Sequence, residues 1–150
     1  MASSRVSQLV PGSAFTYAVS LRVRHPNLDP AVVTETLRLK PLHTWKAGAP
    51  RRSATGAALG GEHRDSYWSA PLPGEAVGVA GFPLELFMAQ QLLQLSRHRE
   101  FLSRIQAESG QISLLIEISR IENAVLTLGT GISRKLADLN IEVEFQFVSE

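Results

Sequence analysis

The sequence contains no cysteine. This absence excludes disulfide bonds, thiolate zinc sites, cysteine-held iron–sulfur clusters and cysteine nucleophiles. No stretch approaches the roughly 20 apolar residues of a membrane-spanning helix. The first fifteen residues, MASSRVSQLVPGSAF, lack the apolar run of a signal peptide. These absences predict a soluble, cytoplasmic protein without a membrane partner.

An excess of charge of one sign is also missing. Lys and Arg number 15 and Asp and Glu number 14, which gives a formal net charge of +1. Domains that coat nucleic acid usually concentrate basic residues, so this balance argues against nucleic acid as the partner. The chain has 150 residues, of which 44% are hydrophobic. That composition is typical of one globular domain with its own core.

Alternation of apolar and polar residues predicts strands near both ends of the chain. It is clearest over 15–23, 112–118 and 141–147. Because every second residue is polar, we expect one face of the sheet to be free of helices. We expect the first and last strands to be neighbours, with Arg22 and Arg24 facing two glutamates of the last strand.

Helical patterns occupy three segments. Asp29 and Pro30 mark the start of a helix that runs to about residue 39. A long apolar face covers 84–108, with a break near Ser96, and a third helix follows Thr130, its expected N-cap. A short strand is expected just before it, at 124–128. Together the patterns predict an α+β fold: a ferredoxin-like, antiparallel-rich sheet with helices packed on one face.

The chain is expected to divide into a flexible tail and one domain. Residues 1–13 are Ser-rich and have little pattern, which is typical of a loose terminus. Residues 14–150 then form a single α+β domain. Within it, an Ala/Gly-rich stretch predicts a mobile loop near 47–63, as the tip of a hairpin-like excursion.

The chain's two tryptophans flank this basic loop and make it a candidate binding site. The candidate residues are Trp45, Lys46, Arg51, Arg52 and Trp68. A rigid stem that presents arginines on a mobile tip suits an anion or a small molecule. The plainer interpretation is that the two indoles pack together, or against the helices, and clamp the base of the loop.

A second candidate surface lies on the long helical segment. Phe87 shares one side of the helix with amides, and the candidate interface residues are Phe87, Gln90, Gln91 and Gln94. An exposed aromatic residue among uncharged amides suits a protein interface. The alternative is that a connecting segment folds over Phe87, or that the helix is rotated.

No catalytic residue, metal site or cofactor is predicted. The segment EHRD at 62–65 has the composition of a solvated loop rather than a metal site. In LGTGISRK, at 128–135, two glycines precede a helix, but the spacing of a phosphate-binding loop is absent. No nucleophile elbow is present. The sequence therefore favours a protein that is not an enzyme, and a hydrolase stays open, because catalytic triads assemble in space and not in sequence.

Several short pieces, in this order, resemble one known family. They are NLDPAVVTETLRLKP, TWKAGAPRR, YWSAP and the ending LGTGISRKLADLNIEVEFQF, which follows the long helical region. The chain resembles the bacterial domain of unknown function 4279 family from about residue 14 to residue 147. The resemblance implies a small bacterial α+β protein and carries over no catalytic residues.

Two functions remain open at this point. The first is a non-enzymatic binding or protein-interaction module, whose partner is another protein or a second copy of the chain. The alternative is a small-molecule or anion-binding protein, enzymatic or not, that uses the basic loop at 46–64.

Overall fold

The structure, a computed structural model, describes residues 15–73, 83–119 and 125–149. The predicted tail at 1–13 lies outside these ranges. The elements follow one another as β1 (Thr16–His25), α2 (Pro30–Leu37), β2 (His43–Trp45), β3 (Pro50–Arg52), β4 (Ala58–Glu62), β5 (Ser66–Pro71), α3 (Leu84–Ser96), α4 (Arg99–Ala107), β6 (Gln111–Ser119), α5 (Thr130–Asp138) and β7 (Glu142–Phe147).

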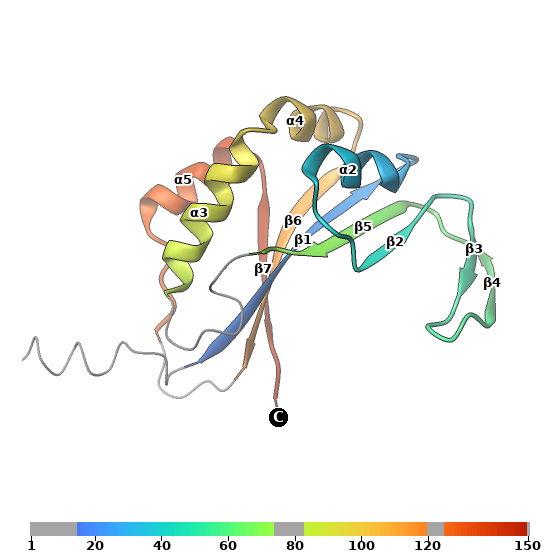
Figure 1. Cartoon of the computed structure of the whole chain (residues 1–150), viewed down its shortest axis with the longest axis horizontal. Coiled ribbons are helices and arrows are strands. Elements are labelled where there is room, and N and C mark those ends of the chain that lie inside the picture. The colour runs from blue at the N-terminus through green and yellow to red at the C-terminus, as the bar shows by residue number, and fades with distance from the viewer. Residues whose placement is uncertain (1–14, 74–82, 120–124, 150) are drawn as a thin grey trace, which may run out of the picture.

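Five strands form one mixed sheet (Figure 1). Their order is β2-β5-β1-β6-β7. The first four are antiparallel to their neighbours, whereas β7 runs parallel to β6. A parallel pair requires a crossover connection, and α5 lies in that connection. The α+β class is confirmed. The ferredoxin-like topology is not confirmed by the strand order and stays a prediction.

One hydrophobic core lies between the sheet and the helices. Val19, Leu21 and Val23 of β1 point into it and are at most 2% exposed. The helices contribute, among others, Leu37, Met88, Leu102 and Leu136. Fully burying such a side chain is worth roughly 1.5–3 kcal/mol. Because all four helices share this core with one face of the sheet, the prediction of helices on a single face is confirmed.

The opposite face of the sheet carries the polar residues of the alternating pattern. The last strand is not a neighbour of β1, as was expected, because β6 lies between them. The predicted charge contact forms nevertheless: Arg22 of β1 makes an ion pair with Glu144 of β7 across β6. The contact is diagonal, because Ser113 of β6 lies opposite Arg22 and Glu142, whereas Glu144 lies opposite Leu115.

Three local expectations are corrected. Helix α2 ends at Leu37, two residues early, because Arg38 adopts a left-handed conformation with φ 56°. Residues 125–128, expected to be part of a strand, have no regular structure. Thr130 makes no capping bond; Glu85 of α3 instead accepts a hydrogen bond from the backbone N–H of Gly129. The predicted break between α3 and α4 is confirmed.

The segment at 47–63 folds as a hairpin that projects from the body (Figure 1). Strands β3 and β4 pair with each other only, and all their residues are exposed. The expected hairpin-like excursion is confirmed by the antiparallel pairing of β2 with β5, but the stretch between them, expected as an irregular loop, forms β3 and β4; its mobility stays a prediction. Among the residues that the structure describes, no helix has the length and apolar character needed to cross a membrane.

Candidate functional site

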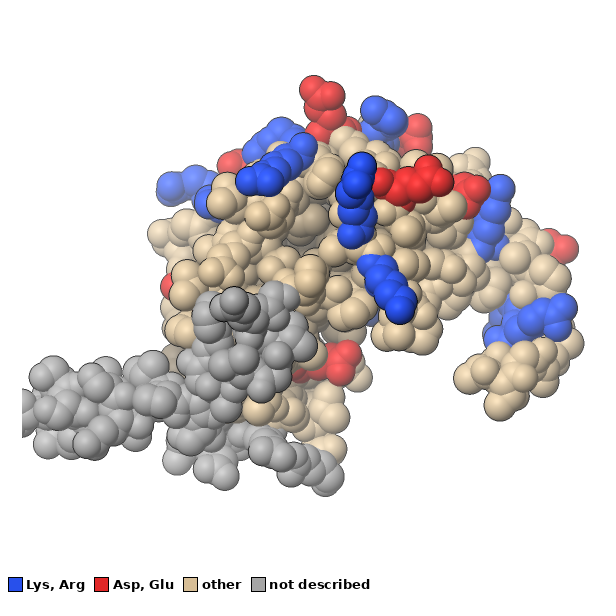
Figure 2. All heavy atoms as spheres, in the orientation of Figure 1, with Lys and Arg blue, Asp and Glu red and all other residues tan. Residues whose placement is uncertain are grey.

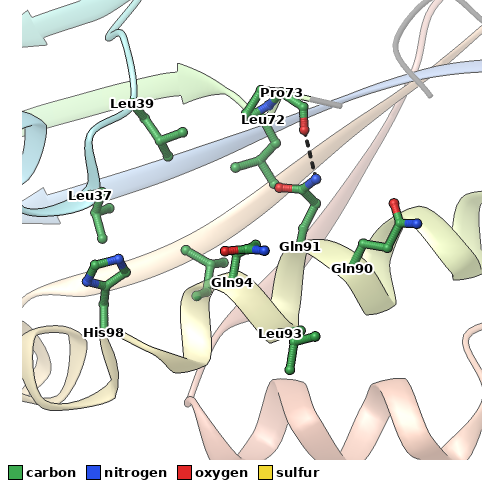
Figure 3. A pocket seen from close by; sticks show the side chains of 10 residues that line it. Leu37, Leu39, Leu72, Pro73, Gln90, Gln91, Leu93, Gln94 and His98 are labelled. Carbon is green, nitrogen blue, oxygen red and sulfur yellow. Dashed lines mark hydrogen bonds between the residues drawn. The ribbon is translucent and has the colours of Figure 1, made fainter. Parts of the chain in front are cut away.

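A groove opens between α2 and α3 on the helix side of the sheet (Figure 3). Its volume is about 570 Å³, which lies within the range of small-molecule pockets. The groove is lined by Leu37, Leu39, Leu72, Pro73, Gln90, Gln91, Leu93, Gln94, Leu95 and His98. Leucines and amides thus dominate its wall, and no carboxylate or basic Lys or Arg side chain is among the described lining residues.

The spacing of residues on α3 explains this lining. Leu84, Met88, Leu92 and Leu95 are buried at helical intervals and fix the rotation of the helix against the core. Gln91 lies next to this stripe and is only 9% exposed. Its Nε2 donates a hydrogen bond to the carbonyl oxygen of Pro73 at 2.8 Å. This bond ties α3 to the segment after β5, and both of its residues line the groove.

Two further amides stand at the rim of the groove. Gln90 and Gln94 are exposed, one helical turn apart, on the side of α3 that faces β5 (Figure 3). Neither side chain hydrogen-bonds to another residue within the described ranges. A glutamine amide both donates and accepts hydrogen bonds. The groove therefore offers an apolar floor beside neutral groups that suit the polar atoms of a bound segment.

The expected exposure of Phe87 is wrong. Its side chain is 0% exposed and its ring packs against that of Tyr17, with the centroids 5.9 Å apart. Helix α3 is rotated so that position 87 faces the sheet, which is the alternative that the sequence left open. The other three interface candidates, Gln90, Gln91 and Gln94, are brought together, since all of them line the groove.

The two tryptophans lie on opposite faces of the sheet. Trp68 is 1% exposed and belongs to the core, so it is not available to a ligand at the surface. Trp45 pairs with Tyr67 across β2 and β5, and successive strand residues point to opposite faces. The expectation that the two indoles pack together is therefore wrong. Packing of Trp68 against a helix is confirmed by its bond to Thr34 of α2.

Trp45 belongs to a stack of planar groups instead. Its indole stacks on the rings of His63 and Tyr67, with both pairs of centroids 4.5 Å apart. His63 and Tyr67 make no ring contact with each other in the described chain, so they cover opposite faces of the indole. Beyond Tyr67, the guanidinium of Arg24 lies 5.1 Å from the ring centroid.

This stack has consequences for binding. Both faces of Trp45 are occupied by the protein itself, so no free indole face remains for a nucleic-acid base. The stack instead joins the hairpin, through His63, to the sheet. The sequence could not reveal it, because the register that places Trp45 beside Tyr67 depends on a pairing between β2 and β5 that no motif marks.

Of the basic residues of the predicted loop site, Lys46 lines an open hollow of about 450 Å³ together with Trp45, whereas the two arginines do not line it. Arg51 and Arg52 lie on β3 and are exposed, as is Lys46 at the base of the hairpin. Figure 2 shows basic side chains on the projecting hairpin, away from the main body of the chain. The only side-chain bond of this group runs from Arg52 to the carbonyl oxygen of Gly56, within the described hairpin. No pocket that combines these arginines with Trp68 can form.

The open face of the sheet holds a small polar hollow of about 280 Å³. Arg22, Arg24 and Tyr67 line one side of it, and Glu142 and Glu144 line the other. The Arg22–Glu144 ion pair crosses the hollow. Because its charges compensate each other, this hollow offers no concentrated field for an anion or a cation.

His25 is a buried polar residue that the sequence patterns do not single out. His25 is 4% exposed, and its Nδ1 accepts hydrogen bonds from the backbone N–H groups of Asn27 and Leu28 at 3.0 and 2.9 Å. Its Nε2, 3.0 Å from Glu108 Oε1, therefore carries the proton and donates it. This arrangement holds the turn between β1 and α2 and gives His25 a structural role. Its only sequence signal is its place at the end of the alternating strand.

Within the described residues, no group of three or more His, Asp or Glu side chains is placed to hold a metal ion. No curated protein and no solved structure matches the chain significantly. One family does match: the family described as Domain of unknown function (DUF4279) covers residues 14–149, which is nearly the whole chain. The protein is therefore a member of the DUF4279 family.

Proposed function

We propose that this protein is a non-enzymatic binding module that takes an apolar segment of another protein into the groove between α2 and α3. The observation that carries this proposal is the composition of the groove: a leucine floor beside the exposed amides of Gln90 and Gln94, which have no side-chain partner among the described residues. Such a surface suits an amphipathic helix or an extended peptide, because apolar side chains fill the floor and the amides meet polar groups at its edge.

Among the described residues, no Lys, Arg, Asp or Glu lines the groove, and this limits the kinds of segment that can bind there. A highly charged segment would lose hydration on entering the groove without gaining an ion pair. An uncharged segment with two or three large apolar residues, spaced for one face of a helix, loses little hydration when it binds, and it buries apolar area. The expected partner is such a segment.

The alternative is a protein that binds a small molecule or an anion with the loop at 46–64. It takes second place, because Lys46, Arg51 and Arg52 are exposed and point to no shared cavity in the described hairpin. The ferredoxin-like topology, the bacterial origin and the cytoplasmic location stay predictions.

A peptide-display selection against the whole chain tests the groove. We expect it to enrich uncharged peptides with apolar residues at helical spacing. Gln94→Glu places a carboxylate beside the leucine wall and should weaken binding of an enriched peptide about tenfold, equivalent to roughly 1.4 kcal/mol. The measurement is fluorescence anisotropy of a labelled peptide.

The matched control is Gln111→Glu, the same isosteric change at an exposed position on the open face of the sheet. It should leave binding unchanged. Failure to enrich any apolar peptide, or an equal loss in both variants, would contradict the proposal. Enrichment of acidic peptides that depend on Arg51 and Arg52 would favour the hairpin instead.

A further inference from the structure

The two edges of the main sheet differ in how well they are protected. An edge strand presents unpaired backbone groups, which natural proteins cover, shorten or interrupt with proline and lysine. The edge strand β2 has only three residues and leads directly into the projecting hairpin. The other edge, β7, has six residues, EVEFQF, and contains neither proline nor lysine.

The apolar side of β7 is increasingly exposed along the strand. Ile141, just before it, is 6% exposed, and Val143 is partly buried against the core. Phe145 and Phe147, on the same side, are 40% and 62% exposed. Two aromatic rings thus stand at a sheet edge, past the part of β7 that the core covers, where solvation of the rings is unfavourable.

The direction of the free backbone groups follows from the pairing with β6. The N–H of Val148 donates to the carbonyl oxygen of Ile118 at 2.8 Å, so residues of even number in this strand bond to β6. In a parallel pair the alternate residues point their N–H and C=O groups away. Val143, Phe145 and Phe147 therefore present both donors and acceptors at the edge, where no strand among the described residues pairs with them.

We propose that β7 pairs with β7 of a second copy of this chain, antiparallel and centred on Phe145, to give a twofold dimer with one continuous sheet. Three hydrogen-bonded residue pairs then form: Phe145 with its counterpart, and Val143 with Phe147 twice. Every outward backbone group of the strand finds a partner, and the exposed rings of the two copies are brought together.

Repulsion between glutamates favours this register over the two in which the pair is centred one or two residues earlier in the strand. With Phe145 at the centre, Glu144 faces Gln146 of the second copy. A shift that centres the pair on Glu144 sets two glutamates directly opposite each other, and a centre on Val143 sets Glu142 against Glu144. Like charges that face each other across strands are destabilising. The pairing is compatible with the proposed function, because the groove lies at α2 and α3, away from β7.

The absence of cysteine from the chain makes the register directly testable. In the proposed dimer, position 145 lies opposite itself at a Cα separation of about 5.5 Å, which falls within the range that a disulfide spans. Phe145→Cys should therefore form a covalent dimer rapidly under mild oxidation. The control is Phe147→Cys, at the more exposed position. Its counterpart in the dimer lies four residues away, roughly 13 Å, so it should cross-link at least tenfold more slowly.

The unmodified chain provides a second readout that does not depend on how the variants fold. Sedimentation velocity across the micromolar range should show a monomer–dimer equilibrium. Gln146→Lys should strengthen it several-fold, because the lysine faces Glu144 of the second copy, and Gln146→Glu should weaken it. Leu59→Lys, at an exposed leucine of the hairpin, should not change it.

A strict monomer at every concentration would overturn the proposal and mean that another strand covers this edge. Faster cross-linking of Phe147→Cys than of Phe145→Cys would also overturn it, because the register would then be different. A weaker dimer for Gln146→Lys would point to a centre at position 146 and would count against the pairing proposed.

Discussion

The indole Nε1 of Trp68 donates a hydrogen bond to Oγ1 of Thr34 at 2.9 Å. The bond joins the middle of α2 to β5, at the border of the core, because Trp68 is buried and Thr34 is partly buried. Trp68 is 1% exposed, so its N–H has no access to water if this acceptor is lost. The contact thus does two things: it satisfies a buried donor and it fixes α2, which forms one wall of the groove.

Thr34→Val measures how much this hydrogen bond contributes to the stability of the fold. Valine keeps the shape of threonine but offers no acceptor, so the indole N–H is left buried and unpaired. We expect the free energy of unfolding to fall by about 1–3 kcal/mol. Urea denaturation followed by tryptophan fluorescence measures the change. Thr36→Val, at a partly buried position of the same helix, is the control and should change stability much less.

The stack around Trp45 should control how firmly the hairpin is held. Aromatic pairs of this kind contribute roughly 0.5–1.5 kcal/mol each beyond their buried area. Trp45→Ala removes the central ring and leaves His63 and Tyr67 without their shared partner. We expect trypsin to cleave after Arg51 and Arg52 several times faster, with a small loss of global stability.

Leu59→Ala, on the same hairpin but outside the stack, is the control for this experiment and should leave the cleavage rate close to that of the wild type. Equal cleavage of the wild type and the Trp45→Ala variant would show that the stack does not hold the hairpin.

Tyr17 predicts a loss of stability in alkaline solution. Burial disfavours the phenolate and raises the pKa of Tyr17 above its ordinary value of 10.0. The folded chain therefore holds this proton more tightly than the unfolded chain. The contribution of the protonated Tyr17 to the stability of the fold is fully present below pH 10.0. It is lost as the pH rises through the raised pKa of the folded chain.

Urea unfolding at a series of alkaline pH values checks this prediction. The wild type should lose stability more steeply above the ordinary tyrosine pKa than Tyr17→Phe, which has no proton to lose at this position. The comparison uses the slopes of stability against pH, because the variant can differ in stability at neutral pH as well. Parallel curves for the two proteins would rule out a buried phenol as the cause.

The strands were the most predictable part of this fold. The alternation over β1 and β6 predicts correctly which side chains are buried, because one face of the sheet is dry and the other wet. In β7 the prediction fails toward the end of the strand, where Phe145 and Phe147, expected on the buried side, are 40% and 62% exposed. The place of β7 was not predictable. Its pattern suits a neighbour of β1 as well as a neighbour of β6, and only the crossover through α5 decides between them.

The candidate site was less predictable, because it depends on rotation and register. The rotation of α3 buries Phe87 together with Gln91, one turn further on, and leaves Gln90 and Gln94 exposed; the apolar residues of this helix cover too wide a face to fix that rotation from the sequence. Trp45 and Trp68 look alike in the sequence, but their positions in paired strands send one to each face. Leu39 and Leu72 reach the groove from segments far apart in the chain, which no local pattern reveals.

The projecting hairpin provides a site for inserting a label or tag. Its strands bond to each other and its residues are exposed, so lengthening or replacing the turn between β3 and β4 should disturb neither the core nor the groove. A fluorophore or an affinity peptide inserted at this turn would report on the groove and on the β7 edge without touching either.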